Sequence, residues 1–172
     1  MPRHILNIAD VQPQPYQVGF APTGAAAERF DARVARISPL LGAQKLGYNL
    51  TVLPPGMRGY PFHHHRVNEE MFFVLEGEGE VRIGEERHAI RPGDIIACPP
   101  GGPEAAHQIV NTGSSDLRYL SISTMQYPEV CEYPDSGKYG VMANFGPSAD
   151  GTPQFFRVVG RQGESVDYWE GE

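Results

Sequence analysis

Turn-forming residues divide most of this chain into short segments. Its 172 residues include 20 glycines and 16 prolines. Turn signals stand at residues 54–56, 77, 84–86, 92–94, 99–103 and 111–113. Between them lie short runs with strand character, at 45–53, 60–66, 70–76, 79–83, 88–91, 95–98, 107–111 and 117–124. Short strands with this regular punctuation predict an all-β chain folded as an antiparallel sandwich or barrel.

The residue pattern also indicates which faces are buried. Residues 45–53 alternate, and one face carries Leu46, Tyr48, Leu50 and Val52. The run 71–75 is apolar on both faces, which predicts a strand covered on both sides. Prolines make residues 1–33 look irregular, except for a short helix predicted over 25–33 with Thr23 as its N-cap. In the C-terminal region, residues 139–145 and 155–159 are predicted strands.

Length and charge limit the number of domains and the classes of partner that this chain can have. A chain of 172 residues is expected to form one domain. The net charge of −7 argues against a nucleic-acid partner and against an anionic membrane surface. The sequence has no apolar run of transmembrane length and no signal-peptide pattern, so a cytoplasmic location is expected. Of its two cysteines, Cys98 reads as a small buried residue and Cys131 lies in a loop-like stretch; neither is assigned a role.

Three consecutive histidines precede one of the predicted strands. Side chains two apart on a strand share a face, so His63 and His65 point the same way and His64 points outward. The pattern breaks after His65, and a new run opens at Glu70. A hairpin at this break brings Glu70 back beside the two histidines, with the neighbouring Glu69 as the alternative. This arrangement predicts part of a metal site.

A fourth ligand is predicted from a later run, which opens at His107. Imidazole and carboxylate together suit a divalent transition metal, and the predicted set is His63, His65, Glu70 and His107. Nothing in the set distinguishes Fe, Mn, Zn, Ni, Co and Cu. Four protein ligands leave open positions on an octahedral ion, which favours a catalytic over a structural site.

Two segments of the chain resemble the two motifs of the cupin family. The first motif is matched by His63, His65, Glu70 and Gly77 at the expected spacing. The second is matched by Gly93, Pro99, Gly101, His107 and Asn111. Two departures stand out: Met57 occupies the usual position of a glycine, and three more residues than usual separate Gly101 from His107. As a whole, the chain resembles small single-domain bacterial cupins of the conserved-barrel type.

The resemblance implies a double-stranded β-helix, the cupin jelly-roll barrel, with irregular N- and C-terminal extensions. The expected division is an N-terminal extension over 1–45, a barrel core over 46–125 that supplies both sheets, and a C-terminal extension over 126–172. That last extension is expected to pack on the barrel or on a second subunit. Because Tyr168 and Trp169 are adjacent aromatic residues, they are the expected contact of a homodimer.

The expected function is that of a metal-dependent enzyme acting on a small organic molecule. The enzyme would be a dioxygenase or an isomerase, and a lyase is a further alternative. A non-catalytic cupin that binds or senses a small ligand is the alternative. Family analogy adds a sugar-phosphate isomerase-like activity. The substrate pocket is expected at the barrel mouth around the metal, and Tyr48 is predicted to line it.

Overall fold

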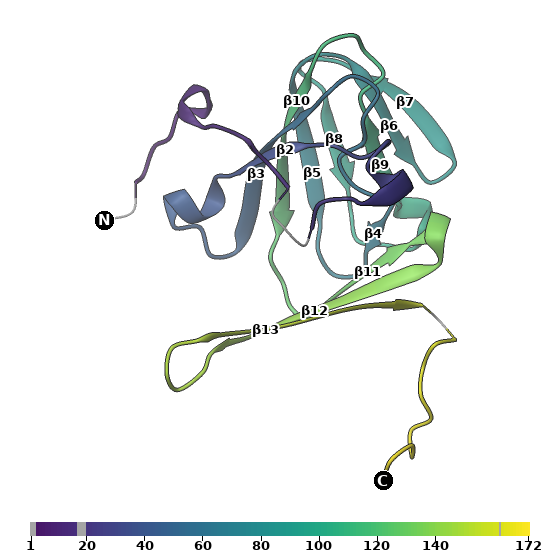
Figure 1. Ribbon diagram of the computed structural model, residues 1–172. Helices are drawn as coiled ribbons and strands as arrows, with labels where there is room; N and C mark the ends of the chain where they lie inside the picture. The colour runs from purple at the N-terminus through teal and green to yellow at the C-terminus, as the bar shows by residue number, and fades with distance from the viewer. Residues whose placement is uncertain (1–2, 17–19, 162) are drawn as a thin grey trace.

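Antiparallel strands make up almost all of the regular structure (Figure 1). The computed structural model describes residues 3–16, 20–161 and 163–172. In these residues the strands are β1 (Gln14–Pro15), β2 (Arg33–Arg36), β3 (Leu46–Leu53), β4 (His64–His65), β5 (Glu70–Glu76), β6 (Gly79–Ile83), β7 (Glu86–Ile90), β8 (Ile95–Cys98), β9 (His107–Val110), β10 (Leu117–Thr124), β11 (Glu129–Tyr133), β12 (Lys138–Pro147) and β13 (Pro153–Arg161). Short 3-10 helices span Ile8–Asp10, Gly24–Ala26, Ser38–Leu41, Pro103–Ala105 and Pro134–Ser136.

The strands form two walls that face each other. One wall is a six-stranded sheet in the order β1-β2-β3-β10-β5-β8. The other combines a three-stranded sheet, β7-β6-β9, with a four-stranded sheet, β13-β12-β11-β4. The two smaller sheets meet where His63 and His107 exchange backbone hydrogen bonds of 3.2 and 2.8 Å. This arrangement confirms the predicted all-β jelly-roll barrel.

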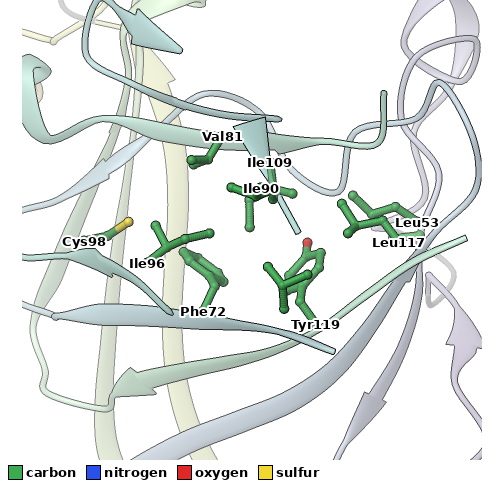
Figure 2. Close-up of a cluster of buried hydrophobic side chains, with 11 residues drawn as sticks. Leu53, Phe72, Val81, Ile90, Ile96, Cys98, Ile109, Leu117 and Tyr119 are labelled. Atoms are coloured by element: carbon green, nitrogen blue, oxygen red, sulfur yellow. The ribbon is translucent and has the colours of Figure 1, made fainter. Parts of the chain in front are cut away.

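The hydrophobic core lies between the walls (Figure 2). The six-stranded sheet contributes side chains such as Phe72, Leu117 and Tyr119, and the three-stranded sheet contributes Val81 and Ile109. A second, smaller cluster covers the opposite face of the six-stranded sheet. It comprises Leu50, Ala35 and Ile37, with partly buried neighbours that include Leu6, Ile8, Val11 and Tyr48. The N-terminal segment therefore covers the outer face of β3, while the inner face of β3 looks toward the barrel interior.

Strands from both extensions join the sheets. β2 pairs with the edge of β3, and β11 pairs with β4. The prediction that residues 46–125 supply both sheets alone is therefore wrong, because long-range pairing recruits these added strands. The strands predicted at 139–145 and 155–159 are present as β12 and β13. The division of the chain into 1–45, 46–125 and 126–172 remains a proposal, with 46–125 as the barrel core.

The helix predicted over residues 25–33 does not form. In its place there is one 3-10 turn at Gly24–Ala26, and the Thr23 side chain makes no capping hydrogen bond. An isolated helix this short is marginal in water, and Arg33 and its successors pair with β3 instead. Among the described residues, no helix has the length and apolar character needed to cross a membrane.

Candidate metal centre

The predicted ligand side chains converge inside the barrel on one carboxylate oxygen. Oε2 of Glu70 lies 3.1 Å from Nε2 of His107, 3.3 Å from Nε2 of His65 and 3.8 Å from Nε2 of His63. Ligand atoms of His63, Glu70 and His107 all lie within 4.8 Å of one another. Glu69, the alternative to Glu70, is exposed. The structure therefore places four side chains from distant parts of the sequence around one point.

Local structure explains this convergence. His63 lies just before β4 and His65 ends it, so the two side chains are two residues apart on extended chain and both point inward. The turn after His65 returns the chain at Glu70, the first residue of β5. The residues inserted after Gly101 form the 3-10 helix Pro103–Ala105, which delivers His107 to the start of β9 opposite His63. The insertion is therefore absorbed in a surface turn, and His107 keeps its place.

Hydrogen bonds from Nδ1 to backbone carbonyls fix how the imidazoles of His63 and His107 are turned. Nδ1 of His63 lies 2.8 Å from the carbonyl oxygen of Pro61, and Nδ1 of His107 lies 3.2 Å from that of Ala105. A proton held on Nδ1 by a carbonyl leaves Nε2 free as a ligand atom. On His65, Nδ1 lies 3.6 Å from Oε2 of Glu129. All three rings thus turn Nε2 toward Glu70.

His65 lacks hydrogen bonds that a buried imidazole normally makes. Both of its ring nitrogens are buried, and neither has a hydrogen-bond partner within the described part of the chain. Glu70 is near Nε2, but not in the direction of a hydrogen bond. Buried polar atoms are normally paired, and an unpaired one needs an explanation such as an ion. A metal between His65 and Glu70 would satisfy both, so the donor set fits a transition metal.

The surroundings of His63 and His65 shift their pKa values in opposite directions. Burial lowers the pKa of His63 to about 4, and the nearby His107 adds to this shift. Burial also acts to lower the pKa of His65, but the carboxylates of Glu129 and Glu70 outweigh it and raise this pKa to about 9. The pKa of Glu70 is far below its usual range, because contact with His107 and His65 outweighs burial. Glu70 is therefore ionised at neutral pH, as a metal ligand must be.

Glu129, a buried carboxylate on β11 that is only 1% exposed, was not among the predicted site residues. It accepts backbone hydrogen bonds from Arg66 (3.1 Å), Val67 (3.2 Å) and Asn68 (2.7 Å), and the Asn68 side-chain amide also donates to it. Glu129 thus holds the turn between His65 and Glu70 while it faces His65. Its position in a Tyr- and Pro-rich stretch gave no signal of this role.

Cys131 and Tyr133, on the same strand, also reach the site. The Cys131 sulfur and ligand nitrogens of His63 and His65 lie within 4.8 Å of one another. The Tyr133 ring stacks near that of His63, with centroids 6.2 Å apart. Burial raises the pKa of the Cys131 thiol to about 12. His64, by contrast, points away from the site as predicted, but it is buried, not surface-exposed, and is 1% exposed.

A cavity of about 220 Å³ opens onto the site. His65, Glu70 and Glu129 line it, and so does Arg36 of β2. The remaining lining residues are polar or long side chains and one glycine: Ser38, Gly47, Asn49, Asn68, Ser121, Ser123, Thr124, Met125, Tyr127 and Met142. A larger hollow of about 450 Å³ is lined by residues of the N-terminal segment and Leu40, and by none of the predicted ligands.

The prediction that Tyr48 lines the substrate pocket is wrong. Tyr48 packs with Leu50 in the cluster on the outer face of β3. Its strand neighbours Gly47 and Asn49 face the cavity instead. Tyr48 shares a face with the other apolar residues of the alternating run, as the sequence indicated. That face, however, is covered by the N-terminal segment and not by the barrel interior.

Comparison with known proteins agrees with this geometry. Residues 49–123 match a family model described as a cupin domain. An uncharacterized protein of Methanocaldococcus jannaschii is 33% identical over 76 residues, which is 44% of this chain and 58% of that protein. An oxalate-binding protein of Thermotoga maritima is 33% identical over 70 residues, or 41% of this chain and 54% of that protein. The matches thus span little more than half the length of these relatives.

A solved structure extends the likeness to nearly the whole chain. It is described as a sugar phosphate isomerase from a cupin superfamily, from Silicibacter pomeroyi. It has a TM-score of 0.74 and 24% identity, and the alignment covers 94% of each chain. The four predicted ligands fall inside the matched residues 49–123, whereas Arg36, Glu129 and Cys131 fall outside them. The family match thus shows a cupin domain over residues 49–123, and the chain shares the fold of this solved structure along nearly its whole length.

Proposed function

We propose that this cupin is a metal-dependent enzyme acting on a small organic molecule, with a divalent transition metal held by His63, His65, Glu70 and His107. The observation that carries the proposal is the position of Glu70 Oε2, within 3.8 Å of Nε2 of all three histidines. Cupin domains commonly bind transition metals. A bound ion would supply Lewis-acid or oxygen chemistry at its open coordination positions.

The cavity supports a small polar substrate. Its volume of about 220 Å³ suits a compact molecule, and its hydroxyl and amide groups suit one that carries oxygen atoms. Arg36 adds a guanidinium to the lining. The described residues provide no salt-bridge partner for Arg36 within 4 Å, so this charge is available to a carboxylate or a phosphate. These features favour a small anion that reaches the metal with one end and Arg36 with the other.

Metal analysis of the purified protein tests the proposal. Inductively coupled plasma mass spectrometry should find close to one transition-metal ion per chain, before or after loading. Iron would point to oxygenase chemistry, whereas manganese or zinc would favour an isomerase or a lyase. A chain that retains none of the six candidate metals after loading and desalting would refute a metal-dependent function.

Binding without turnover is the second candidate function, and the name of the Thermotoga maritima relative, an oxalate-binding protein, favours it. Oxalate fits the small anion described above. If the metal-loaded protein binds oxalate and releases it unchanged, the site is a binder for that ligand. The Silicibacter pomeroyi structure favours a sugar-phosphate isomerase-like activity as a third candidate. Incubation with aldose and ketose phosphates, followed by nuclear magnetic resonance, would reveal their interconversion.

We also propose that the protein is a homodimer whose contact includes the C-terminal tail. Tyr168 is 84% exposed and Trp169 is 72% exposed, so neither is covered by its own barrel. β12 and β13 extend as a hairpin away from the barrel, and the tail lies beyond it (Figure 1). Phe145, Phe155 and Phe156 on that hairpin are also exposed. Aromatic residues are enriched in the cores of protein interfaces.

Truncation after Gly163 tests this contact. Light scattering should report a dimer for the full chain and a monomer for the truncated chain, because the truncation removes both aromatic residues of the tail. A truncated chain that stays dimeric would exclude the tail from the interface. A full-length monomer at micromolar concentration would contradict the dimer itself.

A further inference from the structure

Strand β11 brings a second set of side chains to the metal site. In the β11–β4 pair, Cys131 is opposite His65, and Glu132 is opposite His64. Directly opposed residues of antiparallel strands project from the same face. Cys131 therefore points to the side of the sheet where His65 and His63 point, and Glu132 points with His64 to the other side. The register alone places a thiol beside the two histidines.

The distances agree with the register. The Cys131 sulfur and one nitrogen each of His63 and His65 all lie within 4.8 Å of one another. Ligands on a single ion are at most about 4.4 Å apart, given bond lengths of about 2.1 Å to nitrogen and 2.3 Å to sulfur. A shift of a few tenths of an ångström would bring these three atoms to that separation. Glu70 and His107 form a second set with His63, so one shared ion also requires the two sets to draw together around His63. Cys131 is 3% exposed, so solvent does not separate its sulfur from the site.

We infer that the Cys131 sulfur is a fifth protein ligand to the metal, in addition to the three histidines and Glu70. The inference rests on the proposed metal centre. As the sulfur–metal bond forms, the thiol proton passes to solvent and the residue binds as a thiolate. Five protein donors leave one open position on an octahedral ion, so a substrate would bind through a single atom. A thiolate also favours zinc, cobalt, iron or copper over manganese.

Cobalt substitution tests the inference directly. Bound Co²⁺ gives weak visible bands whatever its ligands, and a thiolate ligand adds a strong sulfur-to-cobalt band in the near ultraviolet. The Co²⁺ protein should show both features. Cys131→Ser should keep the visible bands and lose the near-ultraviolet band. Cys98→Ser is the matched control and should keep both. Cys98 is equally buried and is opposite Glu70 in the β5–β8 pair, but its sulfur belongs to neither candidate ligand set and packs in the hydrophobic core (Figure 2).

The outcomes separate this inference from the proposed function. Visible bands without the near-ultraviolet band in the unaltered protein would show a metal centre that lacks sulfur, and would overturn the inference alone. A near-ultraviolet band that persists unchanged in Cys131→Ser would also overturn the inference and leave the metal centre standing. Failure to bind cobalt at all would overturn the metal centre and this inference with it.

A second measurement avoids dependence on a folded variant. X-ray absorption at the zinc edge of the unaltered, zinc-loaded protein should contain a sulfur shell at about 2.3 Å beside the nitrogen and oxygen shell at about 2.1 Å. A spectrum that fits nitrogen and oxygen only would contradict sulfur ligation. Where Cys131→Ser folds, as judged by circular dichroism, its affinity should fall by a larger factor for Zn²⁺ than for Mn²⁺.

Discussion

Replacing His63 and His65 together with alanine should reduce bound metal from one equivalent per chain to none detectable. The two substitutions remove half of the proposed histidine and glutamate ligands, and they remove the imidazole whose buried nitrogens lack hydrogen bonds. Glu70 and His107 would remain, still 3.1 Å apart, and Cys131 would lose both histidines of its set, so the donors left would not hold an ion against water and chelators. Metal content measured by mass spectrometry after dialysis is the primary readout.

A matched pair of histidines provides the control. His4 and His88 are both exposed and lie outside the site, so the double variant His4→Ala/His88→Ala should keep one equivalent. Thermal unfolding adds an independent readout. A ligand present at about 100 times its Kd stabilises the folded state by about 2.7 kcal/mol, so metal should raise the Tm of the control and leave that of His63→Ala/His65→Ala unchanged. Tight binding of one equivalent by the latter would show that the ion lies elsewhere.

The parts of this fold that could be predicted are those set by short-range patterns. Turn signals and alternation identify the strands of the barrel, because both act within a few residues. The spacing of His63, His65 and Glu70 is also a short-range pattern, because it depends on one strand and one turn. The structure brings their ligand atoms close together, although their role in binding metal remains a proposal.

What could not be predicted depends on pairing between distant segments. Cys131 and Glu129 reach the site only because β11 pairs with β4, more than sixty residues earlier in the sequence. Arg36 reaches the cavity because β2 adds to the edge of β3. Alternation predicts the correct strand face for Tyr48, but it does not show which face meets the N-terminal segment. Loop-like composition around Cys131 concealed a strand with three side chains turned toward the site.

Metal affinity should rise with pH between roughly pH 7 and pH 9 by about tenfold per pH unit for the proton displaced from His65, and this contribution should level off above that range. The cause is His65, whose pKa the carboxylates of Glu129 and Glu70 raise to about 9 against the opposing effect of burial. In the metal-free protein His65 is therefore protonated at pH 7, and the metal must displace that proton. Raising the pH removes the competing proton, so binding becomes tighter.

The other shifted groups do not produce this slope. The pKa of His63 is lowered to about 4, so His63 is already neutral throughout the range. The pKa of Glu70 is lowered as well, so Glu70 is ionised throughout. Each metal ion bound near pH 7 should accordingly release one proton from His65, and sulfur ligation by Cys131 would add a second proton, from the thiol. Calorimetric titration in two buffers of different ionisation heat counts the protons released, and a competing chelator gives the affinity at each pH.

The variant Glu129→Gln tests whether the Glu129 carboxylate raises the pKa of His65. The amide has no negative charge to stabilise protonated His65, so the pKa of His65 should fall and the slope above pH 7 should become shallower. Well above pH 9, where His65 is largely neutral in either protein, the variant should bind metal about 10 to 100 times more weakly, because it loses the carboxylate that orients the imidazole. Loss of a good acceptor for the turn amides should also cost about 1–3 kcal/mol of folding stability. An affinity that is constant from pH 7 to pH 9, with no proton released, would mean that Glu129 does not control the protonation of His65.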